Sequence, residues 1–475
     1  MKILKNMNKY YRNAILSKWW LALVAWHTFT LGQSQIVVTE GVQNAIAKAM
    51  HKDVQLRNQD LEQHKLELER QNVLNKRLPK LEANAIYGYL NNQTNIDIPT
   101  KTLPITGIQL FDGSTDIATE GQAFNGRLTA KAVLYSGGQI ENGAKALQEK
   151  NKGTAYMMAL RKNEVIEDLL TSFDQLEMLR TAEALIQDSD KRLKKENDRV
   201  EKAIALGLAI PYDRDKIKLA RLELETKRTD VQNKKELLAL KINQLTDLSP
   251  EDILAIEHKV EPIVILQNLD TENRNEIKAL EAFKQASEYA IKKEKGALLP
   301  TLGAFGGYSY TSIFNTNTEI PLHKINHTIQ LNTNHITAHP TFMVGVAMKW
   351  KLFNGFESKN NIETAKLNAM QIENKLQDTK EKLNLQLRKN QLEYETMLRQ
   401  IDIAEQREKI AENNNVMAEK QYRNGLIGIT ERITAENDIY KEALNKVETV
   451  IKERKAAIET YKSAGTLDQY IITTL

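Results

Sequence analysis

The sequence contains no cysteine, few prolines and few aromatic residues, and each scarcity excludes a class of structure or chemistry. Without cysteine the chain has no disulfide, no thiolate metal ligand, no cysteine nucleophile and no N-terminal cysteine to carry a lipid. Aromatic residues make up 6% of the 475 residues and prolines number only 9, while charged residues reach 27%. This balance favours long solvated helices over compact globular cores.

A strong excess of charge of either sign is also absent. The formal net charge is +4, and Lys and Arg are interleaved with Asp and Glu instead of forming a basic block. We therefore expect no nucleic-acid partner. The sequence shows no serine, histidine and aspartate constellation and no phosphate-binding loop, so we expect neither an enzyme nor a cofactor.

Four histidines lie close together in one polar segment and raise the question of a metal site. His323, His327, His335 and His339 are spaced so that two pairs would lie one turn apart on a helix. The surrounding Asn and Thr residues favour an irregular loop instead. We therefore expect no metal.

No apolar run is long enough to cross a bilayer as a helix, which needs about 20 residues. The basic residues Lys2, Lys5 and Lys9 precede an apolar stretch over 19–31, and small or polar residues follow at 32–34. This pattern predicts a secretory signal peptide over 1–33, although an amphipathic N-terminal helix remains the alternative. Any membrane span would then have to be made of strands.

The chain repeats itself after about 220 residues, which indicates an internal duplication. We place repeat 1 at 36–258, repeat 2 at 259–467 and a C-terminal tail at 468–475. The matching segments keep nearly one offset: 78–89 with 299–310, 134–138 with 352–356, and 206–210 with 424–428.

Both repeats contain a long segment without proline and nearly without glycine, at 138–206 and 356–424. Each predicts a helix of about 70 residues, or roughly 105 Å at 1.5 Å per residue. Apolar residues recur at mixed spacings of three and four, as in coiled-coil packing. A returning helix is predicted after each, which gives helical hairpins at 138–247 and 356–464. A further helix is predicted over 38–78, where Pro79 ends it.

Strand pairs are predicted at 81–90 with 122–135 and at 301–311 with 341–353. Each strand alternates apolar and polar residues, and the polar segments 91–121 and 312–340 are predicted to be long loops outside the cell. Aromatic residues stand where such strands would meet a membrane interface: Tyr87, Tyr135, Tyr308, Trp350 and Phe353. A half-buried strand of a soluble sheet alternates identically, so the alternation leaves both interpretations open.

The predicted helices of about 70 residues are far longer than those of globular proteins, which favours the membrane interpretation of the strands.

Four strands cannot close a barrel, because an open sheet in lipid leaves edge groups unpaired and the smallest membrane barrels have about eight strands. Several chains must therefore contribute strands to one barrel. Their helical hairpins would stand side by side and continue it as a tube.

The order of these motifs resembles the TolC-like outer-membrane efflux protein family over 39–467. The resemblance is carried by the opening helix at 41–56, the Leu-Pro entries to the odd strands, the Leu/Phe-x-Gly exits from the even ones and the two Gly-Leu turns. It implies a mainly α fold with a small transmembrane β portion. Helical hairpins would form a periplasmic α-barrel, and four antiparallel strands per chain would contribute to a trimeric twelve-stranded β-barrel.

The resemblance also implies a function and partners. The protein would be a homotrimer in the outer membrane of a Gram-negative bacterium, in contact with outer-membrane lipid. It would serve as the passive exit duct of a tripartite system with a periplasmic adaptor and an inner-membrane pump of the RND, ABC or MFS type. The alternative is a secreted or periplasmic coiled-coil protein such as an adaptor, but adaptors carry a single hairpin flanked by lipoyl-like segments.

In the resembled family the hairpin turns dock the adaptor. The matching positions here are Leu206, Gly207, Leu208 and Asp213 in the first turn, and Asn424, Gly425 and Leu426 in the second. The alternative is that each glycine simply ends a helix. Pro211 has no counterpart in the second turn, so the two tips are expected to differ in shape.

The family also narrows its periplasmic aperture with a pair of carboxylates. Glu431 matches the first of them, whereas Thr434 replaces the second. Three copies of Glu431 would favour cations at the mouth. The alternative is an ordinary glutamate near a helix N-terminus, where the helix dipole stabilises it.

Overall fold

The computed structural model describes residues 36–98, 105, 113–265, 269–322, 326–465, 467 and 471–473. The predicted signal peptide lies outside these residues. The chain divides into two compact units. One comprises Met1–Gln63, Lys152–Glu281 and Asn374–Leu475, and the other comprises His64–Asn151 and Ala282–Glu373. We call them the helical unit and the sheet unit.

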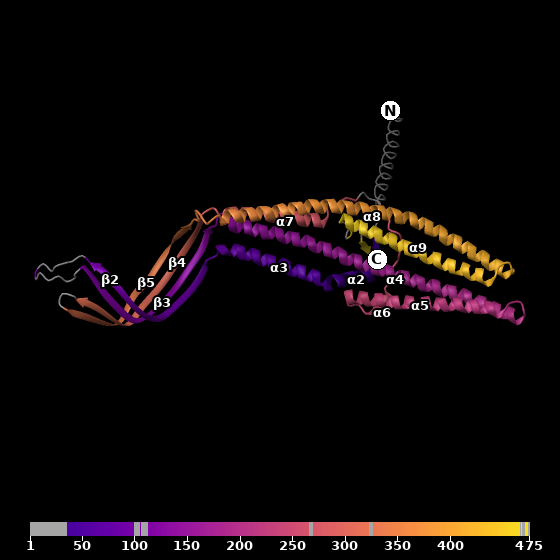
Figure 1. Ribbon diagram of the computed structural model, residues 1–475, viewed down its shortest axis with the longest axis horizontal. Coiled ribbons are helices and arrows are strands. Elements are labelled where there is room, and N and C mark those ends of the chain that lie inside the picture. The colour runs from indigo at the N-terminus through magenta and orange to yellow at the C-terminus, as the bar shows by residue number, and fades with distance from the viewer. Residues whose placement is uncertain are drawn as a thin grey trace, which may run out of the picture. The chain divides into compact units, whose positions relative to one another are not determined.

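The sheet unit contains one four-stranded antiparallel sheet. Its strands are β2 (Lys80–Ile98), β3 (Gly113–Tyr135), β4 (Thr301–Leu322) and β5 (His327–Lys349), and they lie in sequence order (Figure 1). β2 and β5 are therefore the two edges. Within the described residues neither edge pairs with a further strand.

The strands are longer than predicted from the sequence. The loops predicted at 91–121 and 312–340 are too long, because strand residues occupy much of both segments. β2 and β3 pair continuously from Lys80 with Lys131 to Ile98 with Gly113, and β4 and β5 pair to Leu322 with His327. Cross-strand polar bonds support the extension, for example Asn95 Nδ2 to Asp116 Oδ1 at 2.7 Å. Asn and Asp were interpreted as loop residues, but paired antiparallel strands accommodate them where both faces are solvated.

The strand register confirms the two predicted faces. Leu81, Ala130, Gly306 and Val344 form one row across the sheet and share the apolar face. The neighbouring row lies on the polar face because successive side chains alternate. That row consists of Lys80, Lys131, Phe305 and Gly345.

Two helical hairpins dominate the rest of the chain, as predicted. The long helices α4 (Gln139–Ala205) and α8 (Glu357–Arg423) each have 67 residues, and the returning helices α5 (Pro211–Thr246) and α9 (Ile429–Ala464) each have 36 (Figure 1). The equal lengths follow the sequence repeat. None of the helices in the described part of the chain is both long and apolar enough to span a bilayer.

The helix predicted over 38–78 is instead interrupted. It divides into α2 (Glu40–Lys52), α3 (Val54–Leu74) and the 3-10 turn η1 (Asn75–Arg77). Asp53 stands at the break, where its carboxylate accepts the Leu56 N–H at 2.8 Å and pairs with Arg161 at 2.7 Å. The Arg161 guanidinium lowers the pKa of Asp53. Two further helices are α6 (Pro250–Ala255) and α7 (Asn275–Gly296).

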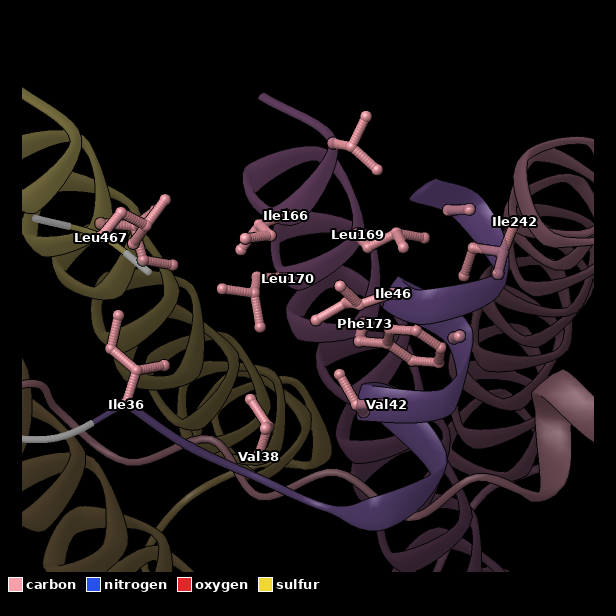
Figure 2. Packing of buried hydrophobic residues seen from close by; sticks show 14 of the residues in the cluster. Ile36, Val38, Val42, Ile46, Ile166, Leu169, Leu170, Phe173, Ile242 and Leu467 are labelled. Atoms are coloured by element: carbon pink, nitrogen blue, oxygen red, sulfur yellow. The ribbon is translucent and has the colours of Figure 1, made fainter. Parts of the chain in front are cut away.

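The main core of the helical unit forms where the two ends of the described chain meet. β1 (Ile36–Val38) pairs in parallel with β6 (Ile471–Thr473). Ile36 and Val38 are fully buried, and α2 packs its apolar face onto α4 beside them, with Val42 near Phe173 (Figure 2). The sequence analysis placed 468–475 in a separate tail. Strands of three residues are too short to give a periodic signal.

Candidate functional site: the hairpin tips and the polar clusters behind them

The first hairpin tip, residues 206–213, contains a glycine in a conformation that other residues rarely adopt. Gly207 has φ +72°, in the left-handed region. The Leu208 N–H donates to the Ala203 carbonyl at 2.8 Å and the Gly207 N–H donates to the Ile204 carbonyl at 3.0 Å. These bonds form a Schellman motif, which satisfies the last carbonyl groups of α4.

The second tip, residues 424–431, repeats the same geometry. Gly425 has φ +70°, and the Leu426 N–H donates to the Gln421 carbonyl at 2.9 Å. The leucine after each glycine points into solvent, with Leu208 80% and Leu426 72% exposed. Each tip therefore presents an apolar side chain that nothing in the single chain covers. A glycine that only terminates a helix would not need an exposed leucine beside it.

After the shared turn the two tips differ. The first continues through Ile210 to Pro211, which is the first residue of α5, and the second continues through Gly428 to Ile429, the first residue of α9. Ile210 and Tyr212 are exposed, whereas Ile429 is buried. The first tip therefore presents more apolar surface.

Asp213 and Glu431 occupy the same position, the third residue of the returning helix. The Ile210 N–H donates to the Asp213 carboxylate at 3.4 Å, and the Glu431 carboxylate lies beside the Gly428 backbone. An acid at this position is stabilised by the free N–H groups of the first turn. The position alone therefore explains both residues, and the aperture role of Glu431 stays a proposal.

A groove along α8 and α9 contains a second carboxylate near Glu431. Its lining includes Glu431, Thr434 and Asp438, which are spaced along one face of α9. Asp438 lies seven residues, or two turns, beyond Glu431. Asp438 is not among the residues predicted from the sequence, although its spacing of seven from Glu431 is a local signal.

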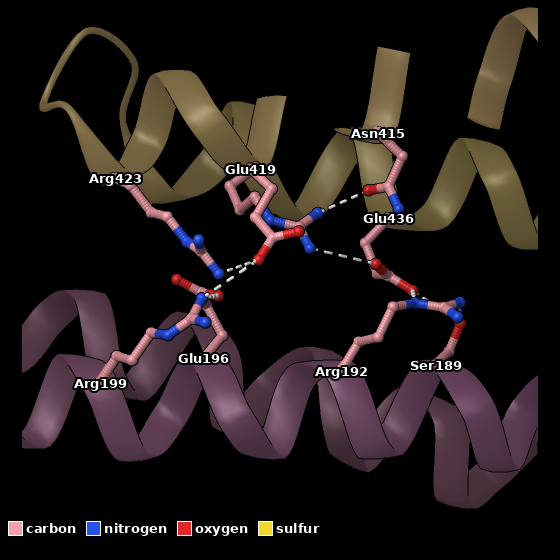
Figure 3. Close-up of polar contacts among 9 residues, drawn as sticks. Ser189, Arg192, Glu196, Arg199, Asn415, Glu419, Arg423 and Glu436 are labelled. Atoms are coloured by element: carbon pink, nitrogen blue, oxygen red, sulfur yellow. Dashed lines mark hydrogen bonds and ion pairs between the residues drawn. The ribbon is translucent and has the colours of Figure 1, made fainter. Parts of the chain in front are cut away.

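Behind the tips, a buried polar cluster joins the two hairpins of one chain. The Glu436 carboxylate of α9 is almost fully buried and accepts hydrogen bonds from Ser189 at 3.0 Å and from Arg192 at 2.7 Å, both on α4 (Figure 3). Arg432 donates to the other Glu436 oxygen at 3.3 Å and to Asn415 of α8 at 2.7 Å. Through Arg432, α8 is also linked to the Glu436 carboxylate.

A second group of charges extends this cluster toward the tips. Glu419 of α8 accepts from Arg423 at 2.5 Å and from Arg199 of α4 at 3.4 Å (Figure 3). Arg199 also pairs with Glu196 at 3.0 Å. Sequence reasoning missed these partners because Arg192 and Glu436 are separated by 244 residues and no local pattern links them.

Another buried cluster holds the segment that follows α6. Asp174 of α4 contacts His258 at 2.5 Å and Arg454 of α9 at 3.0 Å. Glu453 accepts the Ile263 N–H with both carboxylate oxygens, at 3.2 and 3.1 Å. Burial raises the pKa of Glu453 to about 7. These side chains fix the segment between the hairpins and present no nucleophile beside a base.

In the sheet unit, the predicted interface aromatics occupy three levels of the strand register, because Tyr87 lies four residues, or about 13 Å, beyond the level of Tyr308. Tyr135, Trp350 and Phe353 lie at the end of the sheet nearest the helices, whereas Tyr87 and Tyr308 lie further along their strands, and all five are exposed. Tyr308 is six residues beyond Leu302, the register partner of Tyr135, which corresponds to about 20 Å. Membrane barrels have aromatic girdles about 25 Å apart.

The histidines do not converge within the described residues. His335 contacts the Ser312 hydroxyl at 2.9 Å, and His327 begins β5, while His323 and the side chain of His339 lie outside the described part of the chain. Among the described residues, no three potential ligands gather closely enough to hold a metal ion.

Comparisons with known proteins identify relatives of this architecture. Residues 267–466 match the family model described as outer membrane efflux protein. No curated protein matches the chain.

Several solved structures share the fold. CusC is 13% identical with a TM-score of 0.69, over 92% of this chain and 96% of that one. The CmeC outer membrane channel of Campylobacter jejuni is 14% identical with a TM-score of 0.66, over 93% and 91%. The open MtrE outer membrane channel of Neisseria gonorrhoeae is 14% identical with a TM-score of 0.66, over 93% and 92%.

Proposed function

Because residues 267–466 belong to the outer membrane efflux protein family and the whole chain has the TolC-like fold, we propose that this protein is the outer-membrane exit duct of a tripartite efflux or secretion system. It acts as a passive channel and not as an enzyme. Its helical hairpins occupy the periplasm of a Gram-negative bacterium. The repeat indicates that the chain arose by duplication.

One observation carries this proposal: the sheet has an apolar face and two unpaired edges. In lipid, each unpaired backbone group costs several kcal/mol, so an edge of about 20 residues cannot remain open there. Pairing β5 of one copy with β2 of the next removes every edge when three copies contribute four strands each. The resulting barrel has twelve strands, with the polar face inside.

The hairpin tips support a role in docking. Leu208 and Leu426 are exposed at the turns, and the buried Glu436 cluster fixes the two hairpins of one chain relative to each other behind them. We assign these tips to a periplasmic adaptor, which connects the duct to an inner-membrane pump. An adaptor identity for this chain itself is not favoured, because it carries two hairpins and its fold is that of the channels.

Fractionation tests the channel proposal. The protein is expected in the outer membrane as a detergent-extracted trimer that resists SDS until it is boiled. A soluble monomer in the periplasmic fraction would contradict the proposal.

Paired substitutions test the docking assignment. Leu208→Ser and Leu426→Ser are each expected to reduce export in cells and crosslinking to the adaptor, while trimer yield is unchanged. Leu222→Ser is the matched control, because Leu222 is 65% exposed on α5 but lies away from the tip. An equal loss with all three variants would refute a specific role of the tips.

A further inference from the structure

Lysines that lack ion-pair partners gather on the polar face of the sheet, at the end nearest the helices. Lys80 of β2 and Lys131 of β3 are direct cross-strand neighbours. Like charges placed opposite each other destabilise a sheet. Within the described residues neither lysine has an ion-pair partner. Glu82 is the neighbouring carboxylate on the same face, but it forms no ion pair with either lysine among the described residues, so the positive charge of the pair is not neutralised.

These two lysines line an open pocket. Its volume is about 580 Å³, within the range of about 300–1,000 Å³ that small-molecule pockets occupy. Lys76 of η1 is the third lysine, and the remaining lining is mainly apolar. We call this site the basic pocket. It lies entirely within the sheet unit.

An aromatic ring forms part of the wall. Phe305 of β4 is the cross-strand neighbour of Lys131, so its side chain lies on the same polar face. Its register partner on β5 is Gly345, and a Cβ added at Gly345 would come within 3.0 Å of the ring. The glycine therefore leaves room for the ring to lie flat against the strand. The basic pocket combines positive charge with an apolar surface.

Charge is segregated along the sheet. The half nearest the helices carries Arg127 and Lys349 on the same polar face as the lysine pair, with Glu82 as the one carboxylate there among the described residues. On this face the outer half of the described strands carries no Lys, Arg, Asp or Glu. Four acidic residues of that half lie on the opposite face, by the strand register: Asp97, Asp116, Glu120 and Glu319. Among the described strand residues, the positive charge of this face is therefore confined to the half nearest the helices, where it can attract an anion.

From this geometry we infer that the basic pocket binds organic anions with an aromatic or apolar body as they pass through the duct. The inference rests on the proposed function, which turns the polar face into the channel wall and brings three basic pockets to one level. The lysines hold the anionic group by charge-assisted hydrogen bonds, and Phe305 contacts the apolar body. The headgroup of an anionic lipid has the same charge, but lipid lies against the apolar face of the sheet, and the headgroup would have to reach the polar face.

Channel recording in planar bilayers of neutral lipid tests the inference. The probe is 1,3,6-naphthalenetrisulfonate, added on the side of the outer strand ends. It is expected to block the wild-type current, and Lys80→Gln with Lys131→Gln is expected to weaken the block about tenfold or more. The double variant should also shift the reversal potential toward cations. Removal of the lysine repulsion should leave the trimer at least as stable, so loss of folding does not confound the result.

Further variants separate the parts of the pocket. Phe305→Leu is expected to weaken the block by the naphthalene probe but not that by citrate, which has no aromatic body. Lys218→Gln with Lys452→Gln, on the helical hairpins, is the control for lost charge and should retain the block. Equal block of wild type and of the lysine double variant would overturn the inference.

Two other outcomes have distinct meanings. If the wild-type protein forms no trimer and no conductance, the proposed channel function fails and not merely the pocket. If the naphthalene probe has no effect but the lysine double variant changes the stability of the trimer only in bilayers with anionic lipid, the site binds a lipid headgroup and the inference about passing anions is wrong.

Discussion

The buried Glu453 carboxylate makes the stability of the helical unit depend on pH. Its pKa is raised from 4.5 to about 7, chiefly by burial, and the folded chain therefore holds this proton more tightly than the unfolded chain. Stability from this group is fully present below about pH 4.5 and is lost as the pH rises through about 7. At 1.36 kcal/mol per pKa unit, the loss is about 3 kcal/mol.

The substitution Glu453→Gln removes this dependence. A glutamine can still accept the Ile263 N–H, which now reaches both oxygens of Glu453, but it has no charge to bury. We expect the variant to gain about 3 kcal/mol over wild type between pH 4.5 and pH 8. Asp174 and its partners Arg454 and His258 are the same in both proteins, so the difference between the two profiles isolates Glu453.

The assay is unfolding of the detergent-solubilised protein, followed by far-ultraviolet circular dichroism at several pH values. Glu448→Gln, half-buried on the same helix, is the matched control and should follow the wild-type profile. Parallel profiles for wild type and Glu453→Gln would refute the reasoning, because they would mean that the carboxylate is not buried in its charged form.

Three further predictions concern the tips and the cluster behind them. Gly425→Ala should cost about 1–2 kcal/mol in unfolding free energy because φ is +70° there, although an added Cβ meets no atom within 4 Å; wild-type stability would contradict this. Glu436→Ala should cost about 3–5 kcal/mol in unfolding free energy because it leaves Arg432 buried without its carboxylate. The control Asp378→Ala breaks an exposed pair with Lys382 on α8 and should cost under about 1 kcal/mol in the same denaturation assay. Glu431→Gln should reduce cation selectivity and divalent block in planar bilayers, and unchanged values would leave Glu431 with only its helix-capping role.

Much of the secondary structure followed from local signals. The two long helices were predicted to within one residue at each end, because proline and glycine are scarce inside them and Gly207 and Gly425 mark their ends. The alternating faces of the strands were predicted equally well. Each of these features depends on residues a few positions apart, so the sequence displays it directly.

The strand ends and the break near Asp53 were not predicted. Polar residues such as Asn95 belong to strands here because a partner strand offers them hydrogen bonds, and that partner is 21 residues away in sequence. At Asp53 the helix ends where the carboxylate pairs with Arg161, which lies 108 residues further along the chain. The propensities of neighbouring residues contain no information about a partner so far away in the sequence.

For this protein, the sequence by itself determined the repeat, the helical hairpins, the glycine turns and the family resemblance. Only the tertiary structure decided which charges are neutralised and which are not. It placed Glu436 against Arg192 from the other hairpin, and it set Lys80 beside Lys131 with no carboxylate to pair with either. The physical reason is that electrostatic free energy depends on distance and burial, and both are fixed by contacts between segments far apart in the chain.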